Sequence, residues 1–163
     1  MKTDKNSIRA VPESGKHAEL TRTIIGVFYD VHGELGHGFV ESVYKEAMRL
    51  ALTEIGMQVE TELPISVHFR GCCVGNFRAD LIVNNCVLLE LKAIDALEHC
   101  HEAQILHYLK ATTFEVGLLL NFGPSAKVRR FVMDNSRKAF VKQSVSSVKS
   151  AVSSMPIAER RIP

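Results

Sequence analysis

Two carboxylates and a lysine fall on two neighbouring segments whose other residues are mostly apolar. Asp80 stands within residues 77–83, and Glu90 and Lys92 stand within residues 87–93. Carboxylates held side by side in a partly buried place repel each other unless a cation or a proton relieves the repulsion. Oxygen ligands favour Mg²⁺ or Mn²⁺ over zinc, and a neighbouring lysine can stabilise developing negative charge. These residue types indicate metal-assisted phosphoryl chemistry, whereas a surface ion pair is the ordinary explanation of any single short match.

The length of the loop between the two segments decides whether the carboxylates meet. A three-residue loop over residues 84–86 pairs Val83 with Val87 and places Asp80 opposite Glu90. A two-residue loop would set the charged face of one strand against the apolar face of the other, so it is disfavoured. In the favoured register, all the apolar alternate residues share the reverse face: Phe77, Ala79, Leu81, Val83, Val87, Leu89, Leu91 and Ala93.

Apolar periodicity outlines the elements that must position these side chains. Three- and four-residue steps, interrupted by closely spaced glycines, predict two successive helices. The period then changes to two, returns to helical spacing and ends in short apolar runs. The expected elements are helices over about 19–35 and 43–55, an edge strand over 59–69, strands over 74–83 and 87–93, a helix over 99–112, and strands over 115–122 and 127–133. This order favours an α/β fold with a mixed central sheet flanked by helices.

The gross composition is that of one ordinary globular domain. The chain has 163 residues and a net charge of +2, so bulk charge does not decide whether a polyanion is the partner. Its four cysteines lack the spacing of a disulfide framework, and no segment has the apolar length of a signal core or a membrane span. We therefore expect a cytoplasmic protein that does not enter a membrane. Residues 1–16 are expected to form a flexible arm, residues 17–133 the folded domain, and residues 134–163 either an attached helix or a frayed tail.

The chain resembles the PD-(D/E)XK nuclease superfamily at these positions, and within it the GxxExxY family of small bacterial proteins. The resemblance extends over roughly residues 20–133. It is carried by Gly38-Phe39-Val40-Glu41-Ser42-Val43-Tyr44, by Phe77-Arg78-Ala79-Asp80-Leu81 with Glu90-Leu91-Lys92-Ala93, by His101-Glu102-Ala103-Gln104 with Tyr108-Leu109-Lys110-Ala111-Thr112, and by Gly117-Leu118-Leu119-Leu120-Asn121-Phe122-Gly123. Ala79 stands where the superfamily's name has a proline, a residue that contributes no functional group.

The resemblance implies a restriction-endonuclease-like fold with a metal-dependent active site. By analogy, Mg²⁺ or Mn²⁺ would be held by Glu41, Asp80 and Glu90. Lys92 would be the catalytic lysine, and Gln104 an accessory catalytic residue. The implied substrate is nucleic acid, either DNA or RNA. Because a shared fold does not prove activity, the alternative is a catalytically silent nucleic-acid-binding or protein-interaction module on the same fold.

Several of these side chains have an ordinary structural explanation as well. Glu41 lies in the first turn of its helix, where a carboxylate suits the positive end of the helix dipole. Gln104 and Tyr108 are four residues apart, a spacing that fits either a shared site or an exposed polar stripe. Tyr44 is expected to pack inside the domain with its hydroxyl hydrogen-bonded.

Two further clusters invite other functions. A zinc site is suggested by His99, Cys100, His101 and His107, but adjacent positions on a helix diverge by about 100° and do not easily share one ion. Four basic residues either line a phosphate-binding groove or form a solvated face: Lys110, Lys127, Arg129 and Arg130. The oligomeric state stays open, with an exposed strand edge as one route to a homodimer.

Overall fold

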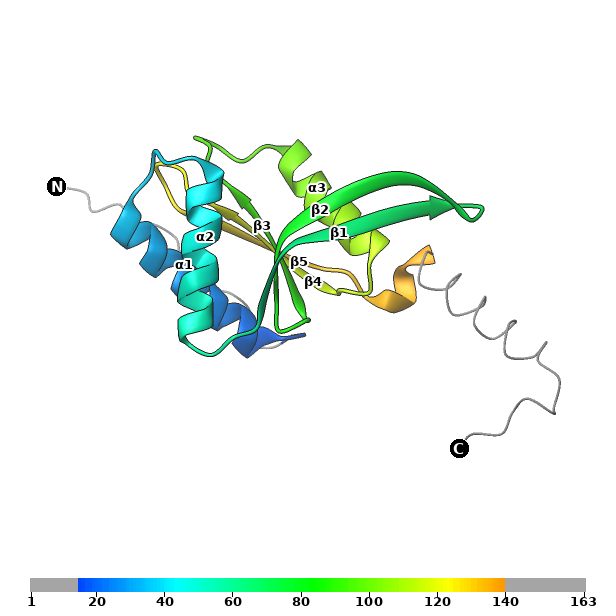
Figure 1. Ribbon diagram of the computed structural model, residues 1–163, viewed down its shortest axis with the longest axis horizontal. Helices are drawn as coiled ribbons and strands as arrows, with labels where there is room; N and C mark the ends of the chain where they lie inside the picture. The colour runs from blue at the N-terminus through cyan, green and yellow to red at the C-terminus, as the bar shows by residue number, and fades with distance from the viewer. Residues whose placement is uncertain (1–14, 140–163) are drawn as a thin grey trace, which may run out of the picture.

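The computed structural model describes residues 15–139, in which helices cover both faces of a five-stranded mixed sheet (Figure 1). The elements in chain order are α1 (Ala18–Leu35), α2 (Glu41–Glu54), β1 (Val59–Phe69), β2 (Cys72–Val83), β3 (Val87–Lys92), α3 (His99–Ala111), β4 (Val116–Asn121), β5 (Lys127–Val132) and a short 3₁₀ helix (Asn135–Arg137). The strands lie in sequence order, and all neighbours are antiparallel except β3 and β4. The predicted α/β fold with a mixed central sheet is therefore confirmed.

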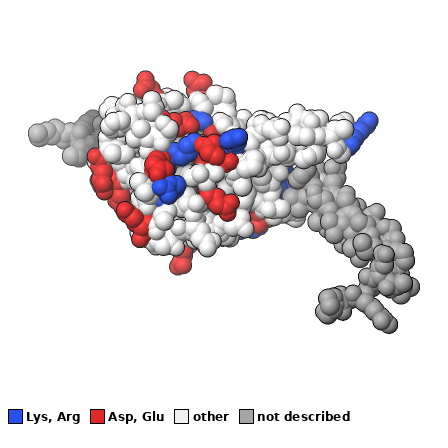
Figure 2. Space-filling model, in the orientation of Figure 1, with Lys and Arg blue, Asp and Glu red and all other residues white. Residues whose placement is uncertain are grey.

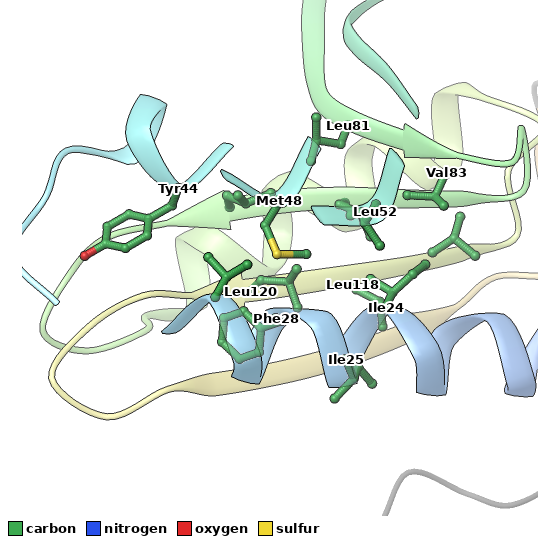
Figure 3. Packing of buried hydrophobic residues seen from close by; sticks show 14 of the residues in the cluster. Ile24, Ile25, Phe28, Tyr44, Met48, Leu52, Leu81, Val83, Leu118 and Leu120 are labelled. Carbon is green, nitrogen blue, oxygen red and sulfur yellow. The ribbon is translucent and has the colours of Figure 1, made fainter. Parts of the chain in front are cut away.

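Helices α1 and α2 pack together over one face of the sheet (Figure 1). Tyr44, Met48 and Leu52 are four residues apart, so they form one buried stripe along α2. This stripe belongs to one buried cluster with residues of α1 and of three strands, part of which is shown in Figure 3. Its other members include Ile24, Ile25, Phe28, Val31, Leu81, Val83, Val87, Leu89, Leu91, Val116, Leu118 and Leu120. Burying each large apolar side chain contributes about 1.5–3 kcal/mol. The packing therefore fixes α2, whose first residue is Glu41, against the strands that carry the acidic residues.

Helix α3 covers the opposite face. Its residues Ile105 and Tyr108 share a second buried cluster with strand residues Ile65, Ala79, Ile82, Leu88 and Leu119. Gly117 on β4 permits the close approach, because a Cβ at this position would lie 2.8 Å from the Cδ1 atom of Ile105. α3 is thus held tightly enough to bring Gln104 and Tyr108 close to the sheet.

The pairing of β2 with β3 has the predicted register. Val83 pairs with Val87, and Leu81 pairs with Leu89. The connecting loop over residues 84–86 begins with two asparagines that both have positive φ. Asparagine adopts this backbone conformation more readily than other residues with a side chain, so the loop chemistry and the register agree.

The prediction that eight apolar residues share one face is wrong for two of them. Ala79 is buried in the cluster beneath α3, and Phe77 is 43% exposed with its ring 5.9 Å from that of Tyr108. The change of face coincides with Glu62, which has a φ of 54° in the middle of β1 and interrupts the pairing of β1 with β2. This local irregularity and the strand twist rotate the outer part of the hairpin, so strict alternation does not continue through Asp80.

Beyond this point the two strands pair only with each other and project past the rest of the sheet (Figure 1). We refer to residues 63–79 as the β1–β2 arm. Pro64 lies in the arm on β1, which is an edge strand of the sheet as predicted. Proline is tolerated at an edge because its missing N–H breaks no ladder bond in a sheet interior.

The predicted N-terminal arm and C-terminal tail lie mostly outside the described residues. Within the described part, Lys16 forms ion pairs of 2.7 Å with both Glu115 and Asp134. The attached helix or frayed tail expected at the C-terminus falls mostly in residues 140–163, which lie outside the described residues. Among the helices of residues 15–139, none has the length and hydropathy that a membrane crossing requires.

Candidate active site

Asp80 lies where β2 separates from β3. The backbone pairing of the two strands ends at Leu81 and Leu89. Immediately beyond, the N–H of Leu91 donates a 2.8 Å hydrogen bond to Oδ2 of Asp80, so a side chain replaces the missing backbone partner. The other carboxylate oxygen, Oδ1, accepts from Nζ of Lys45 at 3.3 Å. We refer to this opening between the diverging strands as the fork.

Glu90 lies on β3 at the fork and is 2% exposed. Its Oε1 accepts a 2.7 Å hydrogen bond from Nζ of Lys92. Its Oε2 is buried and has no hydrogen-bond partner among the described residues. Burial, followed by repulsion from Asp80, raises the pKa of Glu90 to about 7, although Lys92 opposes the increase. The fork therefore holds a carboxylate that is costly to ionise without a further cation.

This pKa makes the stability of the metal-free protein depend on pH. A carboxyl group that is harder to ionise in the folded state stabilises the fold at low pH, and this contribution is lost as pH rises toward about 7. We expect the free energy of unfolding to fall by roughly 2 kcal/mol between pH 5 and pH 8 on account of Glu90. Urea denaturation of wild type and Glu90→Gln in the presence of a chelator measures this difference. An identical pH dependence of the unfolding free energy in both proteins would show that the pKa of Glu90 is not raised.

Lys92 is a protonated ammonium group at neutral pH. Burial lowers the pKa of Lys92, but the hydrogen bond from its Nζ to Glu90 and the charges of Glu90, Glu41 and Asp80 raise it, and the net shift is upward. A lysine held in the charged form stabilises negative charge and orients polar groups, but it does not accept a proton. Its chemistry in this state is therefore electrostatic.

Glu41 is the first residue of α2 and is only partly buried. The pKa of its carboxyl group is raised mainly by burial, with Lys92 acting in the opposite direction and Asp80 adding to the increase. These interactions place Glu41 in the electrostatic neighbourhood of the fork. Its position in the first helical turn suits the helix dipole, and its role as a metal ligand stays a prediction.

The donor set at the fork fits a hard divalent cation, although the three predicted ligands do not converge in this conformation. Within residues 15–139, no three Asp, Glu, His or Cys side chains are grouped closely enough to hold a metal ion. Instead, the ammonium groups of Lys45 and Lys92 lie against the carboxylates of Asp80 and Glu90. A cation with oxygen ligands would bind Oε2 of Glu90, which has no partner among the described residues. It would also relieve the repulsion between the two carboxylates.

Gln104 and Tyr108 approach the fork from α3. Nε2 of Gln104 donates a 2.7 Å hydrogen bond to the hydroxyl of Tyr108. Burial raises the pKa of Tyr108, and the negative charges of Glu90 and Asp80 act in the same direction. Tyr108 therefore lies within electrostatic reach of the acidic residues, and Gln104 is its hydrogen-bond partner. That the two residues share a site with the carboxylates stays a prediction.

Several of the remaining sequence candidates have structural partners. Tyr44 packs against Phe122 with ring centroids 4.3 Å apart, and its hydroxyl donates to the carbonyl of Gly36, as expected for a core tyrosine. Nδ1 of His101 accepts a hydrogen bond from the N–H of Glu98 and so caps α3. Of the four basic residues, Arg129 pairs with Glu102 and Arg130 donates to the carbonyl of Lys16; Lys127 and Lys110 are exposed.

Sequence reasoning missed two charged residues at the fork. Nζ of Lys45 bridges Asp80 and Glu62. Burial lowers the pKa of Lys45, but these ion pairs raise it, and the net shift is upward. The spacing of Lys45, four residues after Glu41, is a signal that places both on one helix face. Glu62 gave no such signal, because its left-handed backbone conformation is not expected for a glutamate inside a strand.

The chain belongs to the PD-(D/E)XK nuclease superfamily. The sequence pattern of this superfamily matches residues 18–131, which span α1, α2, α3 and almost the whole sheet of the described part. The mixed sheet and its flanking helices are accordingly those of a restriction-endonuclease-like fold. No curated protein sequence shows a significant match to the chain.

Solved structures with a similar arrangement share little sequence with the chain. One is the crystal structure of SSO0001, which is 18% identical with a TM-score of 0.47, and the match covers 82% of this chain and 67% of that one. Another is an alkaline exonuclease from Laribacter hongkongensis, which is 12% identical with a TM-score of 0.37 and 86% and 82% coverage.

Proposed function

We propose that the protein is a divalent-metal-dependent phosphodiesterase that cleaves DNA or RNA, and that it is a GxxExxY-type member of its superfamily. The observation that carries the proposal is the buried Oε2 of Glu90, which has no hydrogen-bond partner among residues 15–139, beside the carboxylate of Asp80 in a fork that also holds Lys92. Buried charges without partners are costly, so such a group in a well-packed sheet indicates a ligand.

Asp80 and Glu90 would hold the metal ion, with Glu41 as the third carboxylate available from α2. When bound, Mg²⁺ or Mn²⁺ supplies Lewis-acid polarisation of a phosphoryl oxygen and lowers the pKa of a water molecule. The hydrogen bond from Leu91 to Oδ2 fixes the Asp80 carboxylate, and the packed core fixes the strand that carries Glu90. Strands fixed in this way confine the rearrangement that cation binding requires to the side chains at the fork.

Lys92 would stabilise the negative charge that develops on the phosphoryl group. Its ammonium is already oriented by the Glu90 carboxylate and is partly shielded from solvent, which strengthens its electrostatic effect. Gln104 would contribute as an accessory residue: its amide is held by the Tyr108 hydroxyl on the side of the fork that faces α3. An amide in this position can orient a water molecule or a phosphate oxygen by hydrogen bonding.

The charge of the β1–β2 arm supports nucleic acid as the substrate. Residues 63–79 contain Arg70, Arg78 and a histidine but no aspartate or glutamate. Figure 2 shows charged groups gathered over α2 and the adjoining strands, whereas the projecting arm carries no acidic group on this face and a basic one at its tip. Phe69 and Val74 are exposed near the same tip. Cations and exposed apolar groups that continue from the fork suit a phosphate backbone and its bases.

The arm is expected to bind nucleic acid through its arginines. Replacing Arg70 and Arg78 together with alanine should weaken binding by about tenfold and reduce the slope of log affinity against log salt by about 2, because each phosphate contact contributes about one unit. Fluorescence anisotropy with labelled DNA and RNA measures this in an Asp80→Asn background without added metal. The matched control removes Arg22 and Arg49, which lie on the helices. If both double variants lose affinity equally, the arm has no particular role.

The second candidate is a catalytically silent module that binds nucleic acid or a protein. The observation in its favour is that a lysine already pairs with each of the two central carboxylates, and no three-residue metal group is assembled among residues 15–139. Metal-independent, salt-sensitive nucleic-acid binding without cleavage would support the first form of this function. A protein-interaction module would instead show no nucleic-acid affinity at low salt.

Cleavage assays separate these functions. Purified protein is incubated with single- and double-stranded DNA and RNA in Mg²⁺, in Mn²⁺ and in a chelator. The proposal requires cleavage that depends on the divalent ion and disappears in Asp80→Asn. Cleavage that survives this substitution would come from elsewhere, and binding of the same substrates without cleavage would favour the silent module.

A further inference from the structure

Lys45 is held between two carboxylates of different exposure. Its Nζ lies 3.3 Å from Oδ1 of the buried Asp80 and also pairs with Oε1 of Glu62, whose side chain is 43% exposed. The Lys45 side chain itself is 21% exposed, so its ammonium sits at the mouth of the fork. One lysine thus has an inner partner on β2 and an outer partner on β1.

Glu62 has an unusual backbone conformation at this contact. With a φ of 54° it adopts a left-handed conformation that residues with a side chain avoid inside strands. Such conformations persist only where the surrounding structure enforces them, and they concentrate at functional sites. Here the irregular backbone coincides with an ion pair from Glu62 to Lys45 directly beside Asp80. Because Glu62 is not among the expected metal ligands, its placement needs another explanation.

The net charge around the fork is also compatible with a divalent cation bound while Lys45 stays nearby. Four carboxylates interact there, those of Glu41, Glu62, Asp80 and Glu90, together with the ammonium groups of Lys45 and Lys92. When all are ionised, their formal charge is −2, which one divalent cation neutralises. Lys45 therefore does not have to leave the neighbourhood when a metal ion binds, but it has to release the oxygen of Asp80.

We propose that Lys45 occupies the cation position at Asp80 in the metal-free protein, and that Glu62 takes over its ammonium when a divalent ion binds. The inference rests on the proposed metal-binding function and assigns Lys45 and Glu62 as positioning residues. Lys45 compensates the buried charge of Asp80 while the site is empty of metal. Glu62 retains the displaced ammonium of Lys45. The metal ion therefore competes with Lys45 for Asp80, and the ion pair with Glu62 lowers the cost of moving Lys45 away.

The test measures Mn²⁺ affinity of the full chain by electron paramagnetic resonance, in which free Mn²⁺ gives the signal. Lys45→Met removes the competing cation and should tighten Mn²⁺ binding about tenfold. Glu62→Gln leaves Lys45 with Asp80 as its main partner and should weaken binding severalfold. In the Lys45→Met, Glu62→Gln double variant, the glutamine should have no further effect, because Glu62 acts through Lys45.

Arg49→Met is the matched control. It removes the same charge from the same helix one turn later, where Arg49 pairs with Glu46 instead of the fork residues. Equal Mn²⁺ affinity in Lys45→Met and Arg49→Met, or weaker binding in Lys45→Met, would overturn the inference. A weakening by Glu62→Gln that persists without Lys45 would overturn it too. Because Glu62 is exposed, its single variant remains informative if Lys45→Met does not fold. Wild type that binds no Mn²⁺ would instead overturn the proposed metal site, and this inference with it.

Discussion

Replacing Lys92 with methionine is expected to slow Mg²⁺-dependent cleavage of nucleic acid by on the order of a hundred- to ten-thousandfold. Methionine keeps most of the side-chain volume but removes the ammonium group, which hydrogen-bonds Oε1 of Glu90 at 2.7 Å. The loss is expected in the rate of the chemical step, because a charged group at the fork acts on charge that develops in the transition state. Single-turnover rates with saturating enzyme measure it directly.

Lys127→Met is the control for this substitution. Lys127 is an exposed lysine on β5, so its replacement removes the same charge without touching the fork. We expect its cleavage rate to stay within a fewfold of wild type. Mn²⁺ binding by Lys92→Met should persist, which separates loss of catalysis from loss of the metal. Equal rates in the two variants would show that Lys92 is not the catalytic lysine.

Replacing Gly123 with alanine is expected to destabilise the fold by about 3 kcal/mol, at the upper end of the range for overpacked sites. A Cβ on Gly123 would overlap the carbonyl oxygen of Ile94 and crowd Nδ2 of Asn121. Asn121 is fully buried and holds both the N–H and the carbonyl of Ile94, at 3.1 and 2.8 Å. The added methyl group therefore displaces the backbone just after Lys92, and urea denaturation measures the cost.

Gly26→Ala provides the comparison for this prediction. Gly26 lies within α1, and a Cβ there would have no neighbour within 4 Å. Alanine favours the helix over glycine by up to about 1 kcal/mol, so this variant should be at least as stable as wild type. Equal unfolding midpoints for the two alanine variants would show that the turn at Gly123 adapts freely and does not constrain the position of Lys92.

The sheet and the centre of the candidate site could be predicted from local sequence. Alternation and loop length were enough to pair Val83 with Val87. The strands separate before the predicted pair of Asp80 and Glu90 is formed, and the two carboxylates interact electrostatically across the fork instead. Alternation and loop length rest on short-range rules, because side chains alternate along a strand and two asparagines favour the backbone of the turn. The same rules failed for Phe77 and Ala79, because the twist and the irregular backbone of β1 depend on neighbouring strands.

The contributions of the helices could not be predicted to the same detail. Lys45 shares a helix face with Glu41, but the sequence does not say how far along the sheet α2 packs, and this offset selects which side chain reaches Asp80. The ion pair of Lys45 with Glu62 depends on the fold in the same way. The metal role of Glu41 stays a prediction, since α2 brings it to the electrostatic neighbourhood of the fork without completing a three-carboxylate group among residues 15–139.

The proposed function requires that the fork between β2 and β3 binds a divalent cation between Asp80 and Glu90. Crystals soaked in Mn²⁺ and measured at the manganese absorption edge reveal whether it does, because anomalous scattering locates the ion without assumptions about the site. We predict one strong peak within coordination distance of both carboxylates, about 2.0–2.3 Å from their oxygens, with Nζ of Lys45 moved away from Asp80. A fork without a peak, or a peak bound elsewhere while Lys45 still pairs with Asp80, would contradict the proposed function.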